Sequence, residues 1–483
     1  MNTAEASAHV VSDISEQQLP ILGPPLKSYQ LVLWAVTAVA AFSAAYEFRN
    51  LNLLILLYLF TVLQIARGAT WRRSFYPALG VGLAIGVIHL EFFWNIFSAG
   101  AVCLWLVFAF WIGLFAVVTR ALLQEFRQRW ALLLPPMVWC GLEYFRSELY
   151  YLRFSWASPG YSMAETIGQF ALGALGVYGT AFLLMIAATL AAKRWKDSKW
   201  RGSLILVIGG ALFLGLACFK RAAELPPHGT VQVAGVQMEF PSEKEVLVRL
   251  SETVKQFPKA ELVVLSEYTF QEPIPEKVKS WCRDKKRFLI AGGSEPTGSN
   301  YYNTAFVVSP AGEIVFRQVK AVPIQFFKDG LPAPVQHLWE SPWGKLGICI
   351  CYDLSYRRIT DPLVKLGAQA LIVPTMDVVD WGERQHLLHG RIAPVRSAEY
   401  SLAIFRVSSS GVSQLTDSRG KVLVSAPCPG EGKIIGGTLE IRPHGTLPLD
   451  HYLAPICTAA TCGLMFFTWI RRLHFSRVKG FSA

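Results

Sequence analysis

Residues 344–357 read GKLGICICYDLSYR, an apolar run that opens abruptly into polar sequence at Cys351. The run has the length and apolar character of a buried strand. Other short runs rich in β-branched residues follow the same pattern through residues 225–450, where they alternate with polar, helix-compatible stretches and are separated by Gly, Pro and Asn. The segment 225–450 is therefore predicted to be an α/β domain built on a buried sheet.

Two other predicted strands of this domain also end at a reactive side chain. Glu267 follows the strand in residues 261–270 (ELVVLSEYTF), and Lys320 follows the one in residues 312–323 (GEIVFRQVKAVP). Loops at strand ends commonly carry the functional groups of α/β folds. A carboxylate to accept a thiol proton, a cation to stabilise an oxyanion and a thiolate nucleophile together form a covalent catalyst. Singly, each residue has an ordinary interpretation as a turn, surface or core residue; their order and context favour catalysis.

The rest of the chain is strongly apolar. Of 483 residues, 52% are hydrophobic and 17% are charged, whereas soluble domains carry about 25% charged residues. This composition excludes a wholly soluble, disordered or collagen-like protein and a small disulfide scaffold. Seven apolar segments approach the roughly 20 residues that cross a bilayer, namely residues 29–47, 50–66, 75–97, 100–119, 130–146, 168–191 and 203–219. An eighth lies at 453–470.

Basic residues predict how these segments are oriented. They cluster in the loops after the second, fourth and sixth spans and in the tail at 471–483, which share one side if eight spans are counted. Basic loops stay cytoplasmic, so residues 1–28 and 471–483 are predicted to be cytoplasmic. Residues 29–220 would hold seven transmembrane helices, and the domain at 225–450 would lie outside the cytoplasm. This topology largely explains the net charge of +12, which weakens the case for a nucleic-acid partner.

Glu267, Lys320 and Cys351, in this order on three strand ends, resemble the Glu-Lys-Cys triad of the nitrilase superfamily. The resemblance implies that superfamily's four-layer α-β-β-α sandwich. Residues 153–184 resemble the apolipoprotein N-acyltransferase family, in the pieces Phe154, Trp156, Gly160-Tyr161-Ser162 and Gly176-Val177-Tyr178-Gly179. Seven spans, an extracytoplasmic nitrilase-like domain and one closing span match that family's architecture, so the resemblance covers about residues 29–475.

The resemblance implies an acyl transfer. The Cys351 thiolate would attack an ester of a phospholipid, release a lysophospholipid and leave a thioester. The α-amine of a diacylglyceryl-cysteine lipoprotein would then take the acyl chain. Glu267 would act as general base and acid, and Lys320 would stabilise the oxyanion together with a backbone N–H, with that of Tyr352 as the candidate. The implied protein lies in the bacterial inner membrane, is catalytic on the periplasmic side and needs no metal or organic cofactor. Nothing in the sequence marks a self-complementary interface, so we expect a monomer.

The sequence departs from the family pattern around the triad. Ser266 stands where the family has Pro, and Asp353 stands where it has Glu. The loop after Lys320 reads AVPIQFFKDG and lacks the family's supporting Glu, a place that Asp329 could take. We expect substrate-binding or supporting roles for Tyr352, Asp353, Asp329, Trp156, Tyr161 and Glu399.

Two other functions stay open. A membrane-tethered carbon-nitrogen hydrolase, or amidase, would use the same triad with water as the acceptor. A catalytically impaired relative would only bind lipoproteins, and labelling of Cys351 by a lipid probe would argue against it. His386 and His389 lie three residues apart without a third ligand, so we interpret them as surface or packing residues. The nine cysteines contain no CxxC pair and give no sign of a structural metal site.

Some aromatic and charged residues have two interpretations. Phe326 and Phe327 would either dip into the membrane interface or pack into the domain. Trp339, Trp343 and Trp381 would either line an acyl-chain path or pack in the core. Glu143 and Arg146 are candidates for an ion pair near the extracytoplasmic face of the membrane. Charged residues within a membrane are candidates for function.

Overall fold

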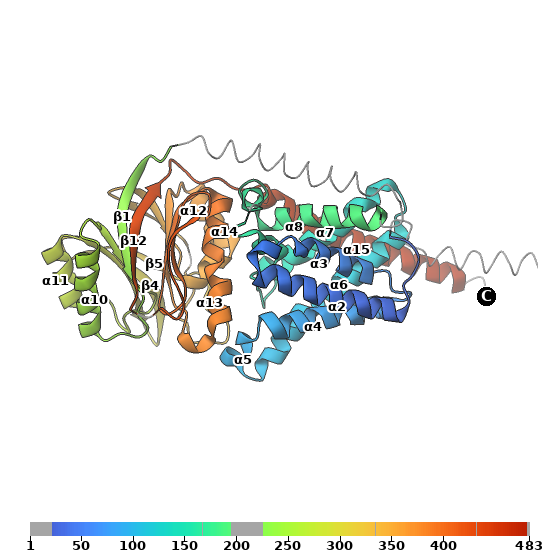
Figure 1. Cartoon of the computed structure of the whole chain (residues 1–483), viewed down its shortest axis with the longest axis horizontal. Coiled ribbons are helices and arrows are strands. Elements are labelled where there is room, and N and C mark those ends of the chain that lie inside the picture. Colours follow the sequence, from blue (N-terminus) through green and yellow to red (C-terminus); the bar gives the residue numbers. More distant parts are fainter. Residues whose placement is uncertain (1–21, 167, 195–225, 334, 431, 481–483) are drawn as a thin grey trace, which may run out of the picture.

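The computed structural model of the chain describes residues 22–166, 168–194, 226–333, 335–430 and 432–480. The predicted span at 203–219, residues 1–21 of the polar segment and residues 481–483 of the tail lie outside this part. Figure 1 shows two bodies packed against each other, a bundle of helices and a sandwich of two sheets.

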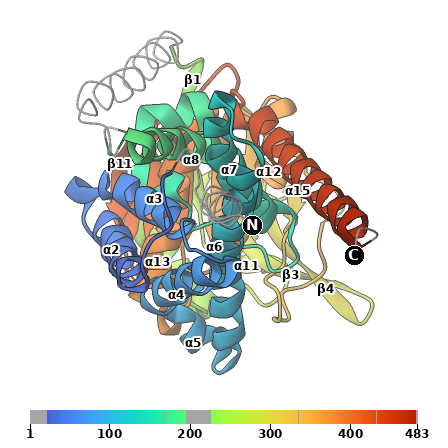
Figure 2. The ribbon, with the colours of Figure 1, turned by 90° about the vertical axis from the view of Figure 1, so that its right-hand side faces the viewer.

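The bundle contains those predicted apolar segments that lie in the described part of the chain. Its helices are α2 (Ser28–Glu47), α3 (Leu54–Ile65), α4 (Trp71–His89), α5 (Phe92–Phe97), α6 (Gly100–Glu125), α7 (Leu134–Tyr144), α8 (Gln169–Arg194) and α15 (Asp450–Gly480). Within the described part of the chain, four helices are long and apolar enough to cross a membrane, over Ser28–Glu47, Gly100–Glu125, Gln169–Lys193 and Asp450–Arg471. Seen along the long axis of the molecule, α15 lies at the rim of the bundle beside α7 (Figure 2).

Two predicted spans are divided in the structure. The segment 75–97 contains the end of α4 and all of α5, and the segment 130–146 contains the short helix η2 (Arg129–Leu133) followed by α7. Pro135 and Pro136 lie in the first turn of α7. Proline favours the start of a helix because it has no N–H to donate and its φ is already helical. The helix therefore begins anew at this point.

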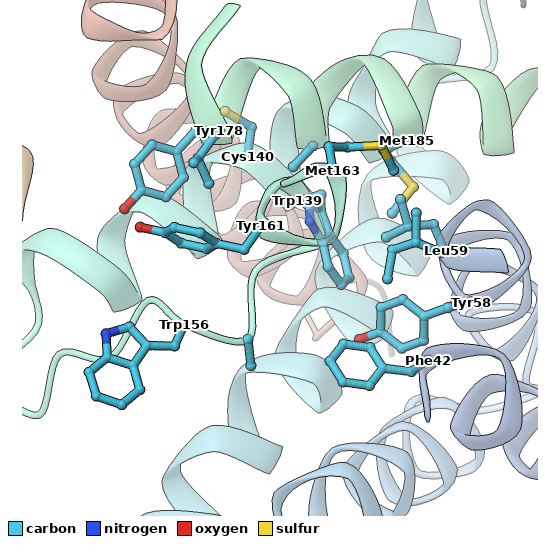
Figure 3. Packing of buried hydrophobic residues seen from close by; sticks show 14 of the residues in the cluster. Phe42, Tyr58, Leu59, Trp139, Cys140, Trp156, Tyr161, Met163, Tyr178 and Met185 are labelled. Carbon is cyan, nitrogen blue, oxygen red and sulfur yellow. The ribbon is translucent and has the colours of Figure 1, made fainter. Parts of the chain in front are cut away.

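Aromatic rings fill the bundle core. Tyr58 on α3 contacts Phe42 on α2 and Trp139 on α7, with ring centroids 5.1 and 6.0 Å apart (Figure 3). Small residues bring the backbones close: a Cβ on Gly82 of α4 would lie 2.6 Å from the Cα of Ala109 on α6. Close approach at small residues is how apolar helices gain packing energy in a membrane. This core holds α5 and α6 in place beside the sandwich.

The sandwich has two six-stranded sheets. The first has the order β12-β1-β2-β3-β4-β5, with strands β1 (Gly229–Val236), β2 (Leu262–Val264), β3 (Phe288–Thr297), β4 (Asn300–Val308), β5 (Ile314–Val319) and β12 (Ile434–Ile441). The second has the order β11-β10-β9-β8-β7-β6, with β6 (Leu338–Ser341), β7 (Gly344–Ile348), β8 (Ala370–Thr375), β9 (Ile404–Ser408), β10 (Ser413–Thr416) and β11 (Val422–Ala426). Strands β1 to β3 are parallel, as are β7 to β9. Buried side chains such as Val264, Ile348 and Phe405 fill the space between the sheets.

Helices cover both outer faces, so the expected α-β-β-α sandwich is confirmed. The first sheet carries α10 (Glu243–Gln256) and α11 (Glu276–Lys285). The second carries α12 (Arg357–Lys365), α13 (Glu383–Gly390) and α14 (Ile392–Tyr400), which lie between the sheet and the bundle (Figure 1). Parallel strands are buried on both faces in such folds, and their carboxyl ends meet at one edge. That edge positions the candidate site.

Charged side chains join the sandwich to the bundle. Glu399 on α14 accepts a hydrogen bond from the backbone N–H of Val177 on α8 at 2.6 Å. Arg357 on α12 forms an ion pair of 2.9 Å with Asp450, the first residue of α15. Both contacts are buried, so the two bodies share one continuous interior. The position of this strand edge relative to α5 and α6 follows from this docking.

Candidate active site

Glu267, Lys320 and Cys351 meet at the ends of three strands. The Lys320 Nζ donates a hydrogen bond of 2.8 Å to Glu267 Oε1. The backbone N–H of Met376 donates to Glu267 Oε2 at 2.8 Å, and the Cys351 thiol donates to the carbonyl of the same Met376 at 3.5 Å. Met376 therefore links the thiol to the carboxylate. All three side chains of the triad are almost completely buried, where electrostatic interactions are strong.

The backbone at the site is strained. Cys351 opens the short helix η5 (Cys351–Ser355) with φ of 52°, and Tyr268, next to Glu267, has the same φ of 52°. A positive φ is uncommon outside glycine and carries an energetic cost. The turn at Cys351 directs the chain abruptly from β7 into η5. Such strain is found at functional sites because the surrounding structure holds it.

Asp329 fills the supporting position beside Lys320. Its carboxylate accepts hydrogen bonds from Lys320 Nζ at 2.7 Å, the N–H of Ile324 at 2.7 Å and the Tyr268 hydroxyl at 2.8 Å. Burial opposes ionisation, but the Lys320 ammonium and these hydrogen bonds outweigh it, and the pKa of Asp329 is held below its usual value. Lys320 therefore lies between two carboxylates, and the pKa of its ammonium is raised because both charges outweigh the effect of burial.

Asn303 connects the two carboxylates and was not found by sequence reasoning. Its Nδ2 donates to Glu267 Oε1 at 2.6 Å and to Asp329 Oδ1 at 3.0 Å. Asn303 lies within β4, in the strand-like run NYYNTAF. An amide side chain inside a strand-like run is the sequence signal that could have indicated it, and the structure shows that this amide is fully buried. Burial raises the pKa of Glu267 despite these donors, which suits a group that must both accept and donate a proton.

Asp353 ties the Lys320 loop to the Cys351 loop. Its carboxylate accepts hydrogen bonds from the backbone N–H groups of Ala321 at 3.0 Å, Val322 at 2.7 Å and Ile350 at 3.3 Å. Burial, which these donors only partly offset, raises the pKa of Asp353 to about 6. The Asp353 carboxylate thus bonds the backbone after Lys320 and the backbone before Cys351, and it fixes the position of one loop relative to the other.

An apolar pocket leads to Cys351. Its walls come from α5, α6, the loop around residues 152–156 and the loop at 324–327, and its empty space, including the part open to solvent, is about 940 Å³. The apolar lining includes Phe92, Phe93, Phe97, Leu104, Val107, Phe108 and Trp111. Two arginines, Arg146 and Arg153, are also among the residues that line this pocket. The bundle and the sandwich each supply part of the wall.

The aromatic candidates divide between the pocket and the core. Phe326, Phe327 and Trp381 line the pocket, and the Phe327 ring lies 5.7 Å from that of Phe97. Phe326 is 70% exposed, so its loop is not packed into the sandwich. The indoles of Trp339 and Trp343 instead pack around Phe288, with centroid distances of 5.5 and 5.3 Å.

The supporting residues expected from the sequence fall into two groups. Tyr352 and Trp156 line the pocket with Cys351, and the Trp156 Nε1 donates to the Ser355 hydroxyl at 2.9 Å. Tyr161 is buried in the bundle core (Figure 3). Glu399 binds α8 and, at 2.5 Å, Arg396. Tyr161 and Glu399 therefore act in packing and docking, away from the pocket.

The other charged candidates lack the expected arrangement. In the described part of the chain, Glu143 and Arg146 form no ion pair within 4 Å, and both carboxylate oxygens of Glu143 are buried without a hydrogen-bond partner.

Among the residues that the structure describes, no group of three or more His, Cys, Asp or Glu side chains could hold a metal ion. His386 and His389 are both buried, which excludes a surface position.

Comparison with known proteins gives matches to both bodies. Residues 34–190 match the family model for the apolipoprotein N-acyltransferase N-terminal domain, and residues 230–439 match that for carbon-nitrogen hydrolase. An apolipoprotein N-acyltransferase of Geobacter metallireducens is 24% identical over 384 residues, which is 69% of this chain and 73% of that protein. One of Nitrosomonas europaea is 25% identical over 411 residues, 73% of this chain and 81% of that protein. A solved carbon-nitrogen hydrolase from Helicobacter pylori G27 covers 44% of this chain and 90% of its own, with 20% identity and a TM-score of 0.39.

Proposed function

We propose, because this chain belongs to the apolipoprotein N-acyltransferase family, that it transfers an acyl chain from a phospholipid to the N-terminal amine of a diacylglyceryl-cysteine lipoprotein. The observation that carries the proposal is the position of Cys351, which lines an apolar pocket shared by bundle and sandwich, with the Glu267–Lys320 pair behind it. A pocket with this lining suits a lipid acyl chain better than a small polar amide.

The first half-reaction makes a thioester on Cys351. Glu267 takes the thiol proton, and the thiolate attacks the carbonyl carbon of the phospholipid ester. Lys320 and the N–H of Tyr352 stabilise the oxyanion that forms. The C–O bond then breaks, its electron pair goes to the leaving oxygen, and Glu267 returns the proton to release a lysophospholipid. Lys320 donates to Glu267 at 2.8 Å, which supports the common action of the two groups.

The second half-reaction transfers the acyl chain. The neutral α-amine of the lipoprotein attacks the thioester carbonyl carbon, and the C–S bond breaks. Glu267 takes a proton from the nitrogen and delivers it to the sulfur, which restores the thiol. The product is an amide on the lipoprotein N-terminus. Both substrates carry acyl chains, and each buried CH₂ group contributes about 0.8 kcal/mol to binding.

The pocket supports both parts of a phospholipid. Aromatic rings from α5 and α6 suit the acyl chain, and Arg146 and Arg153 offer positive charge to the phosphate group. Arg146 is 6% exposed and its Nη1 has no hydrogen-bond partner among the described residues. The guanidinium carbon lies 4.9 Å from the centroid of the Phe108 ring, which leaves Nη1 for a ligand, and a phosphate is its expected partner.

The orientation follows from the basic loops. We place the protein in the bacterial inner membrane with the sandwich on the periplasmic side, because basic loops remain cytoplasmic. Arg120 of α6 donates to the carbonyl of Ala69 before α4, at 2.8 Å. Arg471 of α15 forms an ion pair with Glu125 of α6. These basic segments therefore lie together, at the end of the bundle away from the sandwich (Figure 1).

Mass spectrometry of the purified protein tests the proposal. The protein in detergent would be given phosphatidylethanolamine and a diacylated cysteine lipopeptide. We expect an acyl group on Cys351, a lysophospholipid and a triacylated peptide, all lost in Cys351→Ala. Cys349→Ala is the matched control, since Cys349 is buried two residues earlier and outside the pocket. Its products are expected to match those of the wild type.

Other outcomes distinguish the alternatives. Acylated Cys351 with release of free fatty acid, and no triacylated peptide, would favour a hydrolase with water as the acceptor. No acylation of a folded protein would contradict the acyltransferase and favour a relative that only binds lipoproteins. The acceptor, rather than the first half-reaction, separates transferase from hydrolase.

A further inference from the structure

A second ionisable pair lies in the pocket and has no part in the triad. We propose that His389, oriented by Asp377, accepts the first proton from the acceptor's α-ammonium, so that a neutral amine reaches the Cys351 thioester. This inference rests on the proposed function, because it concerns the second half-reaction. It assigns a residue of α13 as the acceptor of the first ammonium proton, a proton for which the triad offers no free acceptor.

The Asp377 carboxylate defines the tautomer of His389. The His389 Nδ1 lies 2.7 Å from Asp377 Oδ1. A carboxylate only accepts hydrogen bonds, so Nδ1 carries the hydrogen and Nε2 of the neutral ring is an acceptor. Asp377 is itself fully buried and accepts from Arg406 Nη2 at 2.6 Å and the Ser408 hydroxyl at 2.9 Å. Its position is therefore defined independently of the histidine.

The ring of His389 is held at the pocket wall. It stacks on the indole of Trp156, with centroids 4.7 Å apart and planes at 14°. His389 and Trp156 line the pocket together with Cys351. Within the described residues, the hydrogen bond to Asp377 is the one made by this ring, so Nε2 is available to a substrate.

The pair is adjacent to the atoms that react. Asp377 follows Met376, whose carbonyl accepts from the Cys351 thiol and whose N–H donates to Glu267. Met376 therefore bonds Glu267, and the next residue, Asp377, bonds His389. These two adjacent residues connect the two acid–base groups. An acceptor amine approaching the thioester from the pocket passes His389.

Glu267 is poorly placed to take this first proton. Its Oε1 already accepts from Lys320 at 2.8 Å and from Asn303 at 2.6 Å, and its Oε2 accepts from the N–H of Met376 at 2.8 Å. An α-amine has a pKa of about 8 in water and so arrives mostly as an ammonium. Before it can attack, the ammonium must lose a proton that is distinct from the one that Glu267 later moves from nitrogen to sulfur.

The protons and bonds balance with two bases. The N–H bond of the ammonium breaks, its electron pair stays on nitrogen, and Nε2 of His389 takes the proton. The amine then attacks, the C–N bond forms and the C–S bond breaks, while Glu267 passes the second proton to sulfur. The imidazolium releases its proton to solvent through the pocket opening. The net reaction converts ammonium and thioester into amide, thiol and one released proton.

Burial favours the neutral form of His389 and outweighs the effect of Asp377 on its pKa. Burial lowers the pKa of the ring, Asp377 raises it, and Arg406 on β9 and Lys320 beyond β5 lower it, so that it lies below the usual histidine value. A neutral ring accepts a proton, and a protonated ring does not. Transfer should therefore weaken as the pH falls through a value under about 6.5.

Single-turnover mass spectrometry of the full-length protein in detergent tests the pair. In His389→Asn, the amide N–H can still reach Asp377, but the acceptor Nε2 is gone. We expect lysophospholipid release and acyl-Cys351 formation within about twofold of wild type, with transfer to a diacylated cysteine lipopeptide about 10-fold slower at pH 7, where about one-tenth of an amine of pKa about 8 is neutral without help. Transfer should recover as the pH rises above 8, where the amine is neutral without help.

His386→Gln is the matched control, since His386 is buried on the same helix and bonds the Val378 carbonyl through Nε2 at 2.9 Å, outside the pocket. It should leave both half-reactions unchanged. If His389→Asn slows both half-reactions by the same factor, or slows neither, the inference is wrong while the proposed function stands. If the wild type forms no acyl-Cys351, the proposed function fails and the inference falls with it.

Discussion

At the scale of single residues, the site depends on buried carboxylates with different tasks. Asp329 is paired with Lys320 at 2.7 Å and is held ionised. Asp353 has only backbone donors within 3.3 Å and a raised pKa of about 6. The Asp329 carboxylate supplies a negative charge beside Lys320, and the Asp353 carboxylate fixes the relative position of the two loops. A shorter side chain than glutamate at 353 suffices, since its carboxylate already reaches N–H groups on both catalytic loops.

Asp353 predicts a pH dependence. Below about pH 6 its carboxyl becomes protonated, gains a donor and no longer accepts from all three N–H groups, so acyl-enzyme formation should fall as the pH is lowered through this value. Asp353→Asn should slow the reaction about 10-fold or more at neutral pH, because a hydrogen bond to a charged group contributes about 1.5–3 kcal/mol. In Asp353→Asn, the midpoint of the fall in rate at low pH should move, since protonation of Glu267 alone then determines it. Stopped-flow measurement of lysophospholipid release checks this, and an unmoved midpoint would contradict it.

At the scale of elements, the break in α8 decides how the sandwich docks. Gly176 has φ of 74°, outside the helical range. The break frees the N–H groups of Val177 and Tyr178, which donate to Glu399 at 2.6 Å and Asp450 at 2.9 Å. A helix that opens at a glycine can thus bind carboxylates from two other elements. The resemblance of this stretch to a family motif gave no hint of the break.

Gly176→Ala should destabilise the protein. At φ of 74° and ψ of 178° a side chain costs about 1–3 kcal/mol, and a Cβ here would lie 2.2 Å from the Asp450 carboxylate. We expect a melting temperature lower by several degrees in detergent and a matching loss of activity. Gly80→Ala on α4 is the control, since its Cβ would meet nothing within 4 Å. Equal melting temperatures for the two variants would rule out this role of the break.

At the scale of the whole molecule, the pocket exists only where bundle and sandwich meet. Phe93 and Trp111 come from the bundle, whereas Cys351 and Trp381 come from the sandwich. In the proposed orientation, the pocket would lie near the membrane surface, beside helices long and apolar enough to cross a membrane. The basic loops lie at the opposite end of the bundle, so the proposed topology places the two ends in different compartments.

Cysteine labelling in intact cells checks this orientation. Ser299 and Gln128 are exposed, one on the sandwich and one in the loop after α6. With Cys103 and Cys462 changed to serine, Ser299→Cys should react with a membrane-impermeant maleimide once the outer membrane is opened. Gln128→Cys should react only after the inner membrane is lysed. The reverse pattern would overturn the proposed topology.

Local patterns were enough for much of this protein. Apolar runs of membrane length predict helices through composition alone, and β-branched runs that end at Glu267, Lys320 and Cys351 predict strands with reactive ends. Asp329 could be suggested because it follows Lys320 closely in the chain. These features are readable because each depends on residues that are neighbours in sequence.

The tertiary structure decided the rest. Asn303 lies 36 residues from Glu267, Trp156 lies 199 residues from Ser355, and Glu399 lies 222 residues from Val177. No periodicity records such pairs, because hydrogen bonds across the fold depend on which elements pack together. The same holds for Tyr161, which the motif suggested as a substrate contact and the bundle core buries. Sequence alone determined the apolar runs and the strands that end near Glu267, Lys320 and Cys351, whereas packing decided where helices divide and which buried polar groups found partners.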